Sequence, residues 1–188
     1  MDALLLALLL TLALEQGTET QRFVARVAAG TPRPGFAMPA LVLLSALICL
    51  VAAILGAALA ATLSADARLL FLSLALVIAG SGQCGSAIRS RTAAPAPCPV
   101  TAAALVRYGV RRSGENAAFV TAGVAAYTHA PLLTAGGAIV GTLAAFCIAL
   151  TVPVQMLHHR GVRVFQILTG FVLLCAGIIA GADALHLL

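Results

Sequence analysis

The chain has 188 residues, of which 62% are hydrophobic and 9% are charged. A soluble domain carries roughly 25% charged residues, so this chain could not cover a water-facing surface. We therefore expect an all-α integral membrane protein whose first partner is the lipid bilayer. The basic residues are all arginine and are scattered over short loops, which indicates membrane topology and argues against a nucleic-acid partner.

Six apolar segments follow one another along the chain, and most approach the roughly 20 residues that a helix needs to cross a bilayer. They cover residues 2–27, 37–63, 67–82, 100–127, 132–157 and 162–188. The first segment lacks the basic stretch and the small-residue cleavage site of a signal peptide. We expect it to remain in place as the first membrane helix.

The two halves of the chain match at a constant offset of 97 residues. Gly17 falls on Gly114, and Pro34 falls on Pro131. Three helices in each copy would place the second copy upside down in the membrane, as in the inverted repeats of secondary transporters. The predicted units are a three-helix repeat, a linker loop and a second three-helix repeat, at residues 1–82, 83–99 and 100–188.

The arginines predict the orientation of these segments. The loops after the first, third and fifth segments hold seven of them, whereas the loops on the opposite side have only Arg68. The positive-inside rule places the three basic loops in the cytoplasm and both termini outside a bacterial-type inner membrane. Cys84 and Cys98 would then lie in a reducing compartment, where a disulfide is not expected.

A polar motif, Glu-Gln-Gly-Thr-Glu-Thr-Gln, follows the first apolar run. An acid inside or at the edge of a spanning segment predicts a functional site, because hydrocarbon does not tolerate an idle carboxylate. Glu15 and Glu19 are four residues apart and would share one face of a helix. Thr18, Thr20 and Gln21 add oxygens of the kind that a hard cation takes as ligands.

The second copy has a polar stretch at the corresponding place, with Arg112 at the position of Glu15. Glu115 would supply a third carboxylate to the site. An arginine at that depth needs a partner, so we predict an ion pair between Glu15 and Arg112, with Glu115 as the competitor. A plainer alternative is a solvated helix end on which Glu15 and Glu19 pair with arginines one turn away.

The pattern Glu-x-Gly-x-x-Thr-Gln at residues 15–21 resembles the first signature of the Golgi-type manganese/calcium–proton antiporter family. That family has six helices in two inverted repeats, each with a Glu-x-Gly-Asp-(Lys/Arg)-(Thr/Ser) motif, and is related to the lysine exporter superfamily. The resemblance implies exchange of a divalent cation for protons, with the motif acids as metal ligands. The sequence departs from the motifs at Thr18, Glu19, Arg112 and Ala117.

The leading expectation is therefore a divalent cation/proton antiporter, with Glu15, Glu19 and Glu115 as candidate metal ligands. One alternative is a non-transporting membrane protein in which the Glu15–Arg112 ion pair has replaced the metal site. Another is an exporter of a small amino-acid-like solute whose carboxylate is held by Arg112. No nucleophile–base set or cofactor motif indicates an enzyme.

Paired small residues predict close helix packing. Gly137 with Gly141, and Gly177 with Gly181, let helix backbones approach each other. This spacing favours packing inside the chain over a dimer interface, although a homodimer stays open. The four histidines lie in loops or at the C-terminus, and none has a second ligand at helical spacing.

Overall fold

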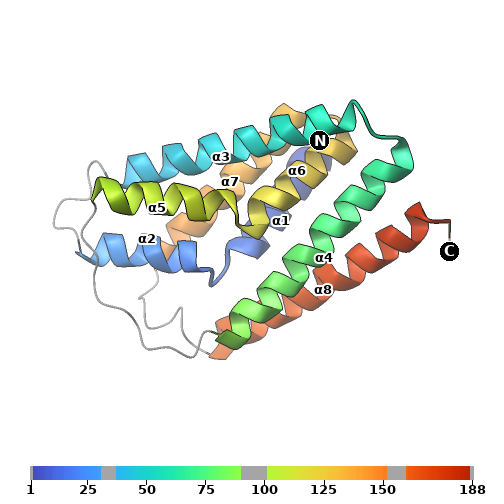
Figure 1. Ribbon diagram of the computed structural model, residues 1–188. Coiled ribbons are helices and arrows are strands. Elements are labelled where there is room, and N and C mark those ends of the chain that lie inside the picture. Colours follow the sequence, from blue (N-terminus) through green and yellow to red (C-terminus); the bar gives the residue numbers. More distant parts are fainter. Residues whose placement is uncertain (1, 31–36, 90–100, 152–159, 187–188) are drawn as a thin grey trace.

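The computed structural model describes residues 2–30, 37–89, 101–151 and 160–186, which form helices and no strand (Figure 1). The helices of this part are α1 (Asp2–Glu15), α2 (Glu19–Gly30), α3 (Ala37–Ala60), α4 (Ala65–Arg89), α5 (Ala102–Ser113), α6 (Asn116–Thr128), α7 (Pro131–Thr151) and α8 (Arg160–Ala184). The predicted all-α class is confirmed for these residues.

Four helices, α3, α4, α7 and α8, are long and apolar enough to cross a membrane. The α1–α2 pair passes the same test only as one span that is bent by 72°. The α5–α6 pair does not qualify, and α5 alone has three arginines in 12 residues. The described residues thus support a membrane protein with four candidate spans, or five with the bent pair, and six spans remain a prediction.

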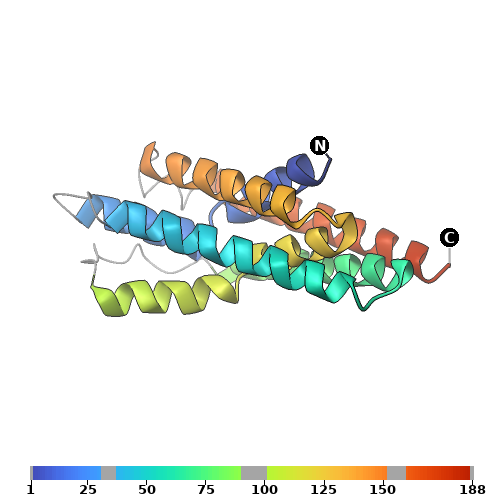
Figure 2. The same ribbon diagram turned by 90° about the horizontal axis from the view of Figure 1, so that it is seen from above.

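Both interrupted segments break inside the polar motifs. Helix α1 ends at Glu15 and α2 begins at Glu19, while α5 ends at Ser113 and α6 begins at Asn116. Both breaks fall near the middle of the molecule (Figure 1). Helices α1 and α6 extend from them toward one end, and α2 and α5 toward the other (Figure 2).

Small residues let the helices pack closely. Helix α1 packs along α7, where a Cβ added at Gly141 would lie 2.7 Å from the Leu8 carbonyl oxygen. Helix α4 packs along α8, where a Cβ at Gly177 would lie 2.9 Å from the Ser73 carbonyl oxygen. Neither position has room for a side chain, so the predicted glycine packing occurs within the chain.

The burial pattern of the described residues is that of a protein surrounded by lipid. Large apolar side chains are exposed on the outer helix faces, as at Leu43 and Leu132, which are 72% and 76% exposed. Polar side chains are buried instead, among them Thr11, Glu15, Gln21, Gln83, Arg112, Thr142 and Gln166. An apolar exterior, with polar side chains buried inside an otherwise apolar core, fits a bilayer, in which polar groups must find partners inside the protein.

The predicted linker at residues 83–99 begins too early, because α4 continues through Arg89. The hydroxyl groups of Ser81 and Ser86 donate to carbonyls one turn back within the helix. Packing against α8 along this stretch outweighs the weak helix propensity of its glycines and serines. The rest of the linker, with Cys98, lies outside the described residues, as does Pro153, where the sequence predicts a kink.

Candidate functional site

Glycine is required where α1 ends. Gly17 has φ +68°, in the left-handed region that other residues rarely adopt. A Cβ at this position would lie 2.6 Å from Gln166 Nε2 and 2.7 Å from Val162 Cγ1, both on α8. The chain therefore turns sharply here, and Glu15, the last residue of α1, has its side chain fully buried.

Long amide side chains satisfy backbone groups that the break leaves free. Gln166 donates from Nε2 to the carbonyl of Gln16 at 2.9 Å. Gln83, from α4, donates from Nε2 to the carbonyl of Leu14. Both glutamines are buried, so they supply partners to carbonyls that the interrupted helix would otherwise leave unsatisfied at a cost in free energy.

Thr18 and Gln21 fix the start of α2. The Thr18 hydroxyl accepts the N–H of Gln21 at 3.2 Å, which is the geometry of a helix N-cap. Gln21 accepts the N–H of Gly17 at 2.6 Å and donates to the carbonyl of Ala145 on α7 at 3.1 Å. Thr18 also donates to the carbonyl of Glu15 at 2.9 Å, so these two motif residues hold the break in shape.

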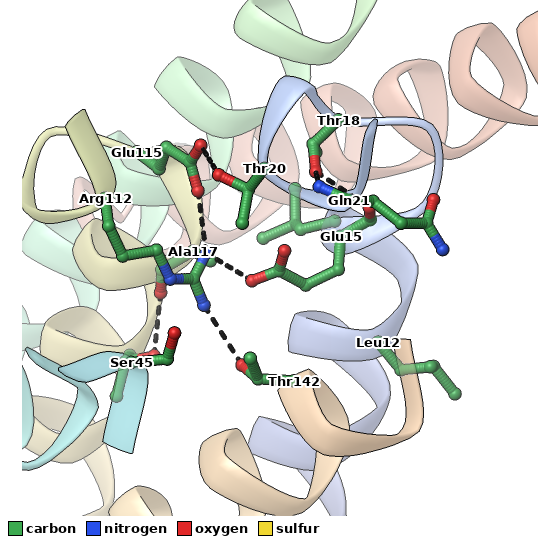
Figure 3. Close-up of polar contacts among 12 residues, drawn as sticks. Leu12, Glu15, Thr18, Thr20, Gln21, Ser45, Arg112, Glu115, Ala117 and Thr142 are labelled. Carbon is green, nitrogen blue, oxygen red and sulfur yellow. Dashed lines mark hydrogen bonds and ion pairs between the residues drawn. The ribbon is translucent and has the colours of Figure 1, made fainter. Parts of the chain in front are cut away.

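A charged cluster joins the two breaks (Figure 3). Arg112 Nη1 forms ion pairs with Glu15 Oε1 and, at 2.7 Å, with Glu115 Oε2. Its Nη2 donates to the Thr142 hydroxyl at 3.0 Å, and the Thr20 hydroxyl donates to Glu115. The structure thus brings Glu15 and Arg112 into the pairing that the 97-residue offset predicts, and the competitor Glu115 shares the same guanidinium.

The cluster is deeply buried and is not charge-balanced. Glu15 and Arg112 are 0% and 1% exposed, whereas the Glu115 side chain is 19% exposed. Two carboxylates face one guanidinium, so the formal charge of the three groups is −1. Glu15 Oε2 and Arg112 Nε make no hydrogen bond among the described residues. A further positive charge, either a proton or a cation, would compensate the buried excess.

Glu19 does not join this cluster. It pairs with Arg111 at 2.9 Å in an exposed ion pair, at the edge of a cavity of about 410 Å³ that Glu15 and Glu115 also line. The 72° bend between α1 and α2 removes the shared helix face on which the sequence argument relied. In the part of the chain that the structure describes, no three acidic, histidine or cysteine side chains are close enough to hold a metal ion.

Sequence reasoning missed three polar side chains near the breaks. Gln83 was assigned to a loop, and Gln166 is a lone amide in an apolar helix, a signal that deserved a functional interpretation. Thr142 lies 97 residues after Ser45, whose hydroxyl is 2.6 Å from the hydroxyl of Tyr108. In the sequence, the offset shows only that Thr142 matches another hydroxyl residue.

The second break is specified differently from the first. Gly114 has φ −92°, and a Cβ there would meet only the Arg111 carbonyl oxygen, at 3.7 Å. Other residues could occupy this position without strain. Asn116 donates to the carbonyl of Ala79 at 3.3 Å and ties the start of α6 to α4.

No protein-family model, curated protein or solved structure matches this chain. The contacts of Glu15, Arg112 and Glu115 are therefore the observations that bear on function.

Proposed function

We propose that the chain is a secondary transporter of cations, specifically a divalent cation/proton antiporter, with its site at the Glu15–Arg112–Glu115 cluster. One observation carries the proposal: the buried Glu15–Arg112 ion pair, shared with Glu115, lies where two helix pairs are interrupted. Interrupted helices with a site at their breaks are a recurrent design of secondary transporters. A purely structural helix bundle has no need for two breaks or for buried acids at them.

The chemistry of the cluster favours a cation as the cargo. Glu15, Glu115, Thr20 and Thr142 offer carboxylate and hydroxyl oxygens, which are the ligands of hard cations such as manganese and calcium. Arg112 occupies the place of a cation between the two carboxylates. Protons and metal ions would compete with this guanidinium for the same oxygens, and such competition couples two transported species.

The proposed arrangement in the membrane has six spans in two inverted repeats, with α5–α6 as the counterpart of α1–α2. The arginine bias then places α2 and α5 in the cytoplasmic half of the protein and both termini outside. The cavity of about 410 Å³ is lined by residues of both breaks and of the end of α4, which would connect the cluster to the cytoplasmic side.

The test is a transport measurement in proteoliposomes, with one dye for manganese or calcium and another for pH. We expect cation flux coupled to opposite proton flux in the parent protein. Glu15→Gln and Glu115→Gln should each lower it by about tenfold or more, since each removes one ligand charge. The control Glu19→Gln alters an exposed ion pair outside the cluster and should keep most of the activity. A folded parent protein that moves neither cation would contradict the proposal.

Arg112 favours a second candidate, an exporter of a small solute that carries a carboxylate. Arg111 and Arg112 both line the cavity, and a guanidinium binds a carboxylate with two parallel hydrogen bonds. Counterflow of labelled amino acids in the same proteoliposomes distinguishes this candidate from the antiporter. Absence of both activities would leave the non-transporting alternative, in which Arg112 closes the site permanently.

A further inference from the structure

A second pocket, lined by arginines and by aromatic rings, lies between α2 and α5 and has a volume of about 100 Å³. Arg26 of α2 and Arg107 and Arg111 of α5 line it, together with the aromatic rings of Phe23 and Tyr108. The two rings stack with their centroids 5.6 Å apart and join the helices beside the arginines. The pocket does not include the buried Glu15–Arg112 pair.

The positive charge of this pocket is only partly compensated. Its one carboxylate, Glu19, pairs with Arg111 at 2.9 Å. Arg26 Nε donates to the backbone carbonyl of Arg22 at 3.3 Å. Within the described residues no carboxylate contacts Arg26 or Arg107, so the pocket has a formal charge of +2. Two guanidinium groups in one small cavity repel each other unless an anion lies between them.

The apolar face beside the pocket indicates where that anion comes from. Val106 and Val110 on α5 are 67% and 72% exposed and are the direct neighbours in sequence of Arg107 and Arg111. Val106 and Val110 share one face of α5, and Arg107 and Arg111 share the adjacent face. A helix with an exposed aliphatic face beside a row of arginines lies against lipid, with the guanidinium groups reaching toward the headgroups. Basic pockets between helices at that level bind anionic headgroups.

We infer that this pocket binds a phosphate oxyanion, supplied by the headgroup of an anionic phospholipid. Arg26 and Arg107 would donate to the phosphate oxygens, and the acyl chains would lie along Val106 and Val110. The pocket, of about 100 Å³, has room for a phosphate group. The inference does not depend on what the Glu15–Arg112 cluster transports.

Native mass spectrometry of the detergent-solubilised protein tests it by comparing retention of phosphatidylglycerol and phosphatidylcholine. The parent protein should prefer phosphatidylglycerol. Arg26→Gln combined with Arg107→Gln should lower that affinity by about thirtyfold, since two arginine contacts are lost. The matched control, Arg160→Gln combined with Arg163→Gln, removes two positive charges from α8 outside the pocket. It should change the affinity for phosphatidylglycerol little.

A circular dichroism melt of each variant checks that it is folded, and Arg107→Gln alone replaces the double variant if the latter does not fold. Inorganic phosphate is the second probe. If phosphate displaces phosphatidylglycerol from the parent protein and not from the pocket variant, the pocket is an oxyanion site. That site would then bind a soluble anion as well as a lipid headgroup. Equal phosphatidylglycerol affinity in the pocket and control variants, or equal affinity of the parent protein for both lipids, would overturn the inference.

Discussion

Replacing Arg112 should destabilise the protein more than replacing its partner Glu15. Arg112→Met keeps most of the side-chain length and removes the charge, which leaves the fully buried Glu15 with no positive partner among the described residues. Glu15→Gln removes the other charge, yet Arg112 still contacts Glu115 at 2.7 Å and Thr142 at 3.0 Å. The asymmetry follows from one guanidinium serving two carboxylates.

The magnitudes can be estimated from these contacts. Breaking a buried ion pair costs roughly 3–5 kcal/mol, and Coulomb's law at 4 Å with an effective dielectric constant of 20 gives about 4 kcal/mol. We therefore expect about 3–5 kcal/mol for Arg112→Met. Glu15→Gln loses one charged hydrogen bond, which costs about 1.5–3 kcal/mol. In the double variant the two losses overlap, so the interaction energy should be about 2–3 kcal/mol.

Unfolding in mixed detergent micelles, followed by circular dichroism at increasing denaturing detergent, measures these free energies. Arg111→Met is the control, because Arg111 is adjacent in sequence but 59% exposed in its pair with Glu19, and it should cost less than about 1 kcal/mol. Two results would refute the reasoning. One is a cost of Glu15→Gln equal to that of Arg112→Met, and the other is additivity of the two single changes within about 0.5 kcal/mol.

Three further predictions concern the breaks and the helix packing, each measured by thermal unfolding in detergent. Gly17→Ala should lower the free energy of unfolding by more than about 1 kcal/mol, because φ is +68° at this position. Gly114→Ala should be tolerated, because φ is −92° there. Equal effects of the two changes would contradict the difference between the two breaks. Gly141→Leu should separate α1 from α7, since a Cβ would already lie 2.7 Å from the Leu8 carbonyl oxygen, and should prevent stable folding. Gln83→Leu removes the amide donor to the last turn of α1 and should cost about 1–3 kcal/mol; an unchanged melting temperature would show that this carbonyl has another partner.

The features that could be predicted from the sequence have strong local causes. Apolar runs longer than a bilayer thickness predict helices, and an acid at the end of such a run predicts a functional site, because neither pattern depends on distant contacts. The Glu15–Arg112 pairing was predicted from the 97-residue offset and the high cost of an isolated arginine in hydrocarbon. Long-range information entered only through that offset.

The failed expectations depend on bend angles and on contacts between distant helices. Glu19 was grouped with Glu15 on the assumption of a continuous helix, and the 72° bend takes it to the surface instead. Gln83 was placed in a loop because glycine and serine follow it, yet packing of α4 on α8 keeps the helix intact and buries the amide. The spacing of apolar residues along a sequence indicates neither the angle of a helix bend nor a hydrogen bond such as that of Gln83 to Leu14, 69 residues away.

The two breaks share a glycine in the sequence but differ in the contacts that hold them. Gly17 is locked by its left-handed conformation and by contact with α8. Gly114 has an ordinary conformation and open space around it, and α5 leaves Val106 and Val110 exposed. An element with few packed neighbours opens at lower free energy than one buried along its length. If the protein transports a cation as proposed, the movement that displaces Arg112 is therefore expected in α5, while α1 holds Glu15 fixed.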